Sequence, residues 1–218
     1  HTNETVKGTD SPLEGAKRGK KTSMWLAIES VKNKKSDVVI SAGNTGALLV
    51  ISKINLKMIE NIDKPALSAL WPNKTGMSVV LDLGANIECN PKNLIDFSIM
   101  GSSLFKSLYP NDNAKVALLN IGTEEIKGNE MIKETYQKLS QKKNQDFEFK
   151  GYIEGNQLMN GDVNVIVADG FTGNIALKTA EGTASFIINE LKKATTGNFI
   201  GKISSCLLYT SDAADDSL

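Results

Sequence analysis

The chain has 218 residues, of which 25 are Lys or Arg and 25 are Asp or Glu, so its formal net charge is zero. A length of this order can bury one sizeable core, and a balanced charge does not favour nucleic acid as a partner. The aromatic content of 6% argues against a base-stacking platform, and no apolar run approaches the roughly 20 residues that span a bilayer.

Spacing predicts the first elements. Met24, Ile28 and Val31 recur at helical intervals and predict a helix within residues 17–33. The stretch 37–56 then changes from a short apolar run to a Gly-Asn-Thr-Gly break and a second apolar run. We expect a buried strand, a tight turn and a helix there.

The same pattern of strand, polar loop and helix repeats three times. Strands are predicted at residues 78–83, 115–121 and 163–168. The helix after the first strand should begin at about residue 91, and the helices after the second and third strands should end at about residues 143 and 193. Their Val/Ile/Leu runs do not alternate with polar residues, which is typical of parallel strands that are covered on both faces. The fold class that we predict is α/β, a three-layer α/β/α sandwich with a mostly parallel sheet.

The two ends of the chain differ from the rest. It begins at His1 rather than at Met, and the string CLLYTSDAADD from Cys206 shares no pattern with the helical stretch before it. That string resembles a translated sequencing-library adapter. We therefore expect residues 1–205 to form an incomplete α/β/α domain and residues 206–218 to be a non-native tail.

Polar residues follow each predicted strand, where ligands bind in open parallel sheets. Asp82, Asn86, Asn120, Asp169 and Asn174 would share one edge, and Glu124 is a candidate base beside them. Each has an ordinary structural alternative, because Asp and Asn form turns and helix caps and a Glu stabilises a helix start. Glycines and free N–H groups in the Ser41–Gly46 turn would suit an anion, although such turns are also common without function.

Several chemistries lack their residues. The only His is His1, so a Ser-His-Asp or Cys-His system has no base. Clustered His or Cys ligands are absent, whereas a carboxylate-bound Mg²⁺ stays open. The fingerprints GxGxxG and GxxxxGK[ST] are missing too, which disfavours dinucleotides and nucleoside triphosphates. Cys89 has no cationic neighbour to lower its pKa, so we interpret it as structural. With Cys206 far from Cys89 and no CxxC pair, the cysteines indicate a reducing cytoplasm.

Five ordered segments resemble the phosphate acyltransferase family of phospholipid synthesis. They are Val39 to Leu48 (VISAGNTGAL), Leu81 to Asn86 (LDLGAN), Met100-Gly101-Ser102, Leu118 to Glu130 (LLNIGTEEIKGNE) and Asp169 to Gly182 (DGFTGNIALKTAEG). His1-Thr2 and Lys17 to Met24 also fit, so the resemblance covers about residues 1–203.

The resemblance implies a fold similar to isocitrate and isopropylmalate dehydrogenases and to phosphotransacetylases. It also implies a homodimer that converts acyl-ACP and inorganic phosphate to acyl phosphate and free acyl carrier protein, without a metal or an organic cofactor. Such enzymes are cytoplasmic and contact the membrane peripherally, through a region that is truncated here near Asn198-Phe199-Ile200. The family's N-terminal strand and its final Gly-rich segment lie outside this chain.

On this reading phosphate attacks the thioester directly, so the enzyme positions it and stabilises the oxyanion. The catalytic residues would be Asp82, Asn86, Asn120, Glu124 and Asp169. The residues that bind phosphate or substrate would be Ser41, Gly43, Asn44, Thr45, Gly46, Gly84, Gly122, Gly170, Thr172, Gly173 and Asn174. Alternatives are a short-chain phosphotransacetylase that uses acyl-CoA, an isopropylmalate-type dehydrogenase, and a non-catalytic membrane-associated scaffold.

Overall fold

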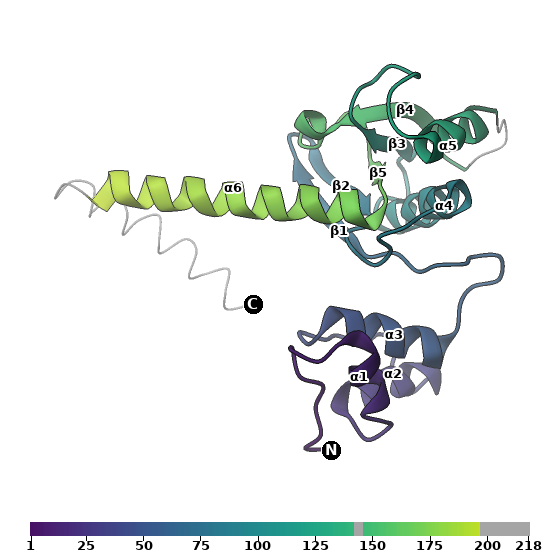
Figure 1. Cartoon of the computed structure of the whole chain (residues 1–218), viewed down its shortest axis with the longest axis vertical. Helices are drawn as coiled ribbons and strands as arrows, with labels where there is room; N and C mark the ends of the chain where they lie inside the picture. The colour runs from purple at the N-terminus through teal and green to yellow at the C-terminus, as the bar shows by residue number, and fades with distance from the viewer. Residues whose placement is uncertain (142–145, 197–218) are drawn as a thin grey trace. The chain divides into compact units, whose positions relative to one another are not determined.

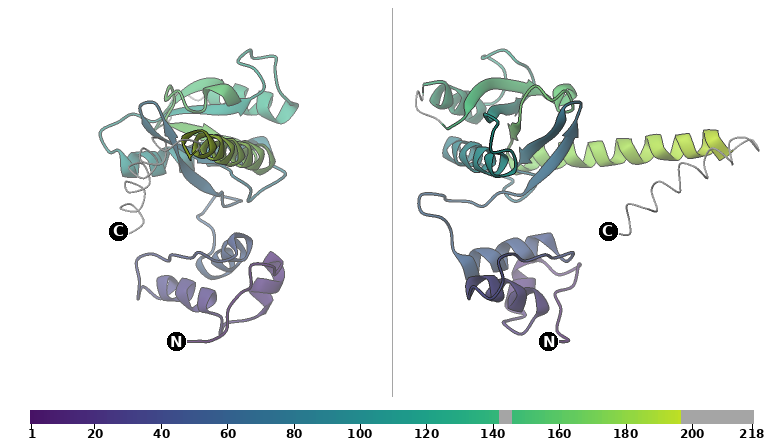
Figure 2. Two further views of the ribbon diagram at one scale, coloured as in Figure 1. Left: turned by 90° about the vertical axis from the view of Figure 1, so that its left-hand side faces the viewer. Right: turned by 180° about the vertical axis from the view of Figure 1, so that it is seen from behind.

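The structure, a computed structural model, describes residues 1–141 and 146–196, with side chains as far as residue 193 (Figures 1 and 2). The chain divides into two compact units, and the boundary lies between Gly173 and Asn174. Each unit is described by itself below.

Three helices form a small cluster near the N-terminus: α1 (Pro12–Lys17), α2 (Ser23–Lys32) and α3 (Thr45–Leu56). Local chemistry sets where each begins. A capping box between Ser11 and Glu14 starts α1, while the side chains of Thr22 and Asn44 cap α2 and α3. The helices enclose a core of their own, made of Met24, Trp25, Ile28, Ala47 and Ile51.

A five-stranded sheet follows, in the order β1-β2-β5-β3-β4. Its strands are β1 (Ser68–Asn73), β2 (Gly76–Leu81), β3 (Lys115–Asn120), β4 (Glu148–Glu154) and β5 (Val165–Val167). Only β1 is antiparallel to its neighbour; β2, β5, β3 and β4 run parallel. The carboxyl ends of these four strands therefore lie along one edge.

Two helices, α4 (Pro91–Leu108) and α5 (Glu130–Gln141), pack on one face of this sheet. Leu94, Phe97 and Phe105 of α4 meet the side chains of alternate strand residues in the main core. Strand residues that face the other way, Val80 and Ile166 among them, are buried as well. The burial of both strand faces and the mostly parallel sheet agree with the predicted α/β class. A short 3-10 helix, η1 (Gly155–Gln157), follows β4.

The last helix, α6 (Gly170–Thr196), begins four residues before the second unit starts at Asn174, and its remainder forms the described part of that unit. Its predicted end near residue 193 agrees with the structure. Within the described ranges, none of the helices is both long and apolar enough to cross a membrane.

Two sequence expectations were wrong. Residues 38–41 form no strand, and Val38 and Ile40 are 69% and 91% exposed rather than buried. An apolar run becomes a strand only beside a neighbour that accepts its backbone hydrogen bonds, and no described strand pairs with this run. The helix expected to start at about Glu124 begins only at Glu130, because a loop that includes Gly128 in the left-handed region (φ 92°) intervenes.

The strands β1 and β4 were not expected from the sequence pattern. Both are edge strands of the sheet. Neither has the continuous run of buried residues that β3 and β5 have, and β1 contains Pro72, which is tolerated where a strand has only one partner.

Candidate functional site

Residues from separate loops meet at the edge where the four parallel strands end. Asp82 directly follows β2, Asn120 ends β3, and Asp169 lies two residues after β5. The structure thus brings these three predicted residues to one side of the sheet, together with the loops that follow them.

Asp82 is completely buried. One carboxylate oxygen accepts the backbone N–H groups of Leu67, Gly84 and Ala85 at 3.0, 3.2 and 3.0 Å. The other accepts the backbone N–H and the side-chain amide of Asn86 at 2.8 and 2.7 Å. With five donors on two oxygens, this carboxylate is committed to holding its own loop.

Asn86 joins this loop to a second segment. Its side-chain amide also donates to the backbone carbonyl of Pro65 at 2.7 Å, and the backbone carbonyl of Asn86 accepts the N–H of Gly170 at 2.8 Å. Asp82 and Ala168 are linked the same way, by the Asp82 N–H to the Ala168 carbonyl at 3.0 Å. Backbone bonds therefore connect the loops after β2 and β5.

Gly170 and Gly173 make this approach possible. A Cβ atom at Gly170 would come within 2.6 Å of the Asn86 carbonyl oxygen. A Cβ at Gly173 would overlap the carbonyl oxygen of Asp82. These two glycines serve close backbone packing, whereas the sequence reading assigned them to substrate.

Asp169 immediately precedes α6 and caps its N-terminus. Its two carboxylate oxygens accept the backbone N–H and the hydroxyl of Thr172, at 2.9 and 2.7 Å. A carboxylate is already present where a helix N-terminus would attract an anion. Asn174, the last residue predicted for this loop, lies two residues after Thr172 and belongs to the second unit.

Asn120 organises the loop after β3. Its side-chain amide donates to the carbonyls of Gly122 and Lys127 at 3.1 and 3.2 Å, which closes the loop on itself. Gly128 packs against the same side chain, with no room there for a Cβ. Glu124 is exposed in this loop and lies ahead of α5, not at its start.

The Ser41–Gly46 turn lies in the helical cluster and centres on Asn44. The Asn44 side-chain oxygen accepts the Ala47 N–H at 3.0 Å and so caps α3. Its amide group donates to the carbonyls of Lys7, Gly8 and Asp10, the last at 2.7 Å. Asn44 thereby ties the N-terminal segment to the turn. Gly43 donates its N–H to the Ser41 hydroxyl at 3.2 Å.

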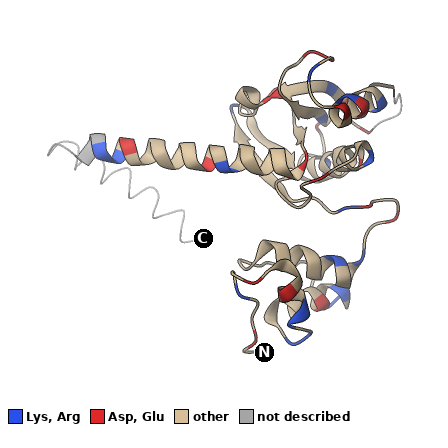
Figure 3. Ribbon diagram, viewed as in Figure 1, with Lys and Arg blue, Asp and Glu red and all other residues tan. Residues whose placement is uncertain are grey.

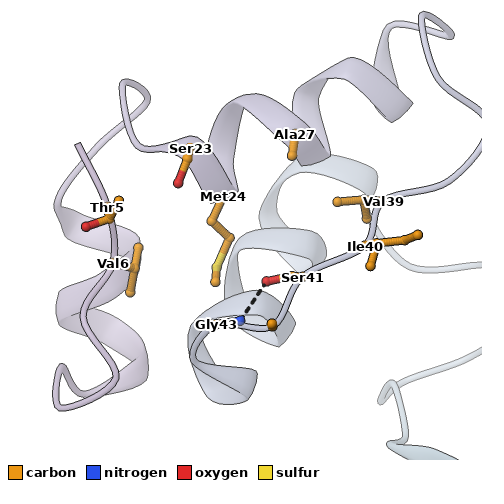
Figure 4. A pocket seen from close by; sticks show the side chains of 10 residues that line it. Thr5, Val6, Ser23, Met24, Ala27, Val39, Ile40, Ser41 and Gly43 are labelled. Atoms are coloured by element: carbon orange, nitrogen blue, oxygen red, sulfur yellow. Dashed lines mark hydrogen bonds between the residues drawn. The ribbon is translucent and has the colours of Figure 1, made fainter. Parts of the chain in front are cut away.

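A cleft of about 390 Å³ opens beside this turn (Figure 4). We call it the apolar cleft, and its lining residues are Thr5, Val6, Ser23, Met24, Ala27, Val39, Ile40, Ser41, Ala42 and Gly43. Of these the sequence reading had singled out only Ser41 and Gly43 for binding. Met24 was recognised as an apolar helix position, but its spacing does not distinguish a core residue from a cleft wall.

Cys89 is half-buried beside the Asp82 loop, and its thiol donates to the Asn86 carbonyl at a sulfur–oxygen distance of 3.6 Å. Burial raises the pKa of the Cys89 thiol, against the smaller opposing effects of the Gly170 N–H and Lys64. A raised pKa leaves less thiolate at neutral pH, which agrees with a structural Cys89. In the described ranges no group of three or more His, Cys, Asp or Glu side chains could hold a metal ion.

Replacing Asp82 tests its place in the loop. Asp82→Asn keeps the volume but turns one acceptor oxygen into an NH₂ group that faces backbone N–H donors, so we expect a loss of roughly 2–3 kcal/mol in the free energy of unfolding. Urea unfolding followed by circular dichroism measures it. Asp112→Asn, at an exposed position, is the matched control, and equal small effects in both variants would contradict the assignment.

The raised pKa of Cys89 predicts slow alkylation. In a Cys206→Ser background, the rate constant with iodoacetamide should be low at pH 7 and keep rising above pH ~8.5, where an ordinary thiol levels off. The urea-unfolded chain supplies the reference curve. A rate that levels off at or below the reference pH would show that burial does not control this thiol.

Comparison with known proteins supplies the family. Residues 1–214 match the model of the family described as "Fatty acid synthesis protein". A curated phosphate acyltransferase of Pelagibacter ubique is 87% identical over 207 residues, which cover 95% of this chain and 62% of that protein. One from Maricaulis maris is 45% identical over 208 residues, covering 95% of this chain and 59% of that protein. The chain thus spans about three fifths of the length of these relatives.

Solved structures share the fold. A phosphotransacetylase from Staphylococcus aureus matches with a TM-score of 0.58 at 18% identity, over 83% of this chain and 61% of that one. One from Streptococcus pyogenes matches with a TM-score of 0.57 at 16% identity, over 79% of this chain and 58% of that one. The family expected from the ordered motifs is confirmed: the chain belongs to the fatty acid synthesis protein family, and the two curated relatives above carry the name phosphate acyltransferase.

Proposed function

We propose that the protein transfers a fatty acyl group from acyl carrier protein to inorganic phosphate and releases acyl phosphate for phospholipid synthesis. The observation that carries this proposal is the family match over residues 1–214, joined to curated relatives named phosphate acyltransferase. The identity of the acyl donor and the pathway rest on the resemblance of the five ordered segments.

The reaction needs no protein nucleophile. A phosphate oxygen attacks the thioester carbonyl carbon, the carbonyl oxygen takes up the negative charge, and the C–S bond then breaks to release the carrier thiolate, which takes up a proton. Such a route depends on positioning and on N–H donors for the oxyanion. The raised pKa of Cys89, which leaves little thiolate to act as a nucleophile, is consistent with it.

Charge favours the Ser41–Gly46 turn over the start of α6 as the phosphate site. Both are helix N-termini, where backbone N–H groups attract anions. The cap of α6 is the carboxylate of Asp169, which already accepts two bonds from Thr172 and would repel phosphate. The cap of α3 is the neutral amide of Asn44, beside the exposed Thr45.

The residues at the sheet edge divide by what they touch. The side chains of Asp82, Asn86 and Asn120 form hydrogen bonds with loop groups, so we assign these residues to positioning the loops. Glu124 is exposed and is the remaining candidate to accept the proton of monohydrogen phosphate. Gly84 takes a positive φ of 129° in its loop, and Gly122 is buried where a Cβ would lie 2.8 Å from the Glu124 carboxylate, so both glycines shape their own loops.

The carrier protein would dock on the helical cluster. Residues 1–57 contain ten Lys or Arg and five Asp or Glu, while the whole chain is neutral (Figure 3). Lys17, at the end of α1, is exposed, and so are Lys20 and Lys21 in the segment before α2. An acidic carrier is attracted to a positive surface of this kind, chiefly through its association rate.

Helix α6 carries exposed apolar side chains, among them Phe186, Ile187, Ile188 and Leu191, which are 50–65% exposed. Several exposed apolar side chains on one helix are typical of contacts with a second copy or with a membrane surface. It supports the homodimer and the peripheral membrane contact of a cytoplasmic enzyme that the family resemblance implies. The segment expected to continue this contact, from Asn198, lies outside the described residues.

Donor preference tests the reaction. The test protein is a chimera in which residues 1–205 replace the segment that they match in the Pelagibacter ubique relative. We expect acyl phosphate to form from long-chain acyl carrier protein at least tenfold faster than from acetyl-CoA, as measured by hydroxamate trapping. Equal or reversed rates would support the phosphotransacetylase alternative, and membrane flotation without any turnover would support the scaffold.

A charge at Thr45 tests the phosphate site. Thr45→Asp places a carboxylate in the first turn of α3, where it stabilises the helix but repels a bound anion. The KM for phosphate should rise roughly tenfold, the size expected for like charges several ångströms apart near a protein surface. Thr45→Asn, of the same size but neutral, should leave KM near its original value. An unchanged KM in the Asp variant would move the phosphate site elsewhere.

A further inference from the structure

We propose that the apolar cleft beside the Ser41–Gly46 turn binds the hydrocarbon chain of the acyl group that is transferred. This inference rests on the proposed function and adds to it the residues that would determine preference for chain length. None of the relatives' names specifies where the acyl chain is held.

The walls of the cleft are mostly aliphatic. Helix α2 contributes Met24 and Ala27, the segment before the turn contributes Val39 and Ile40, and Val6 closes the opposite side (Figure 4). None of the lining residues is charged, and the polar side chains are the hydroxyls of Thr5, Ser23 and Ser41. At about 390 Å³ the cleft is within the usual size range of small-molecule sites. Its chemistry suits an uncharged hydrocarbon.

The cleft leads directly to the turn proposed for phosphate. Ser41 and Gly43 line the cleft, and Asn44, the next residue, caps α3. Gly43 lies against Met24, since a Cβ at Gly43 would be 3.1 Å from the Met24 methyl carbon. The aliphatic cleft therefore meets the Ser41 hydroxyl and the start of the Ser41–Gly46 turn within one short segment. An acyl phosphate has the same division, with a hydrocarbon tail and an anionic head.

The main competing occupant is a polypeptide segment paired with residues 38–41, which would cover the exposed Val38 and Ile40. The two occupants make different demands on Ala27. If a hydrocarbon chain occupies the cleft, a larger side chain at position 27 excludes part of that chain from it, and a longer acyl chain loses more buried methylenes. A polypeptide covering the cleft would make the effect independent of the acyl chain.

Narrowing the cleft is the test. In the chimera, Ala27→Leu should reduce kcat/KM with a C16 acyl carrier protein at least tenfold relative to a C4 donor, because each methylene excluded from an apolar site costs about fourfold. The KM for phosphate should not change. The matched control is Ser30→Leu, which enlarges a small side chain one turn later on α2, outside the cleft lining. It should keep the original chain-length profile.

Equal loss for both donors, or no loss, would overturn the inference while leaving the reaction intact. If the unsubstituted chimera makes no acyl phosphate, the proposed reaction fails and a second measurement decides the cleft. Binding of a fluorescent C16 fatty acid to the 218-residue chain should then be weakened at least fivefold by Ala27→Leu and not by Ser30→Leu. Failure of the fatty acid to bind, or equal binding by all three chains, would reject the cleft as an acyl site.

Discussion

The buried carboxylate of Asp82 is the interaction on which the sheet edge depends. A charge that is wholly removed from water is tolerated only when its hydrogen bonds are replaced. Asp82 accepts five hydrogen bonds from four residues, Leu67, Gly84, Ala85 and Asn86. The last three of these residues lie within four positions of Asp82 in the sequence. The loop after β2 is shaped around this requirement. Its form then determines where Asn86 and Cys89 lie.

The second loop is attached to the first through the backbone. Ala168, Gly170 and Gly173 pass so close to the Asp82 loop that side chains at the two glycines would overlap main-chain atoms. Carboxylates and amides that read as catalytic in the sequence thus turn out to fix one loop against another. This leaves N–H groups and exposed residues to contact a substrate, which fits the proposed reaction, in which phosphate itself is the nucleophile.

The helical cluster repeats the same principle with a neutral group. Asn44 satisfies three carbonyls of the N-terminal segment and one N–H of α3, and so joins stretches more than thirty residues apart. Because it is an amide, the helix end keeps its positive character, in contrast to the Asp169 end of α6. The apolar cleft beside it is a consequence of how α2 and the residues before the turn meet.

The sequence by itself determined the class of fold, most of the parallel strands and the family. Continuous runs such as Lys115–Asn120 and Val165–Val167 are apolar enough to require cover on both faces, and ordered motifs are local in sequence. It did not determine the state of residues 38–41, because a strand exists only through its partner. Nor could it decide what Asp82 and Asp169 do, because the sequence does not distinguish an Asp whose carboxylate caps a loop from one whose carboxylate contacts a substrate. Only the tertiary structure decides that, through the donors it brings within hydrogen-bonding distance.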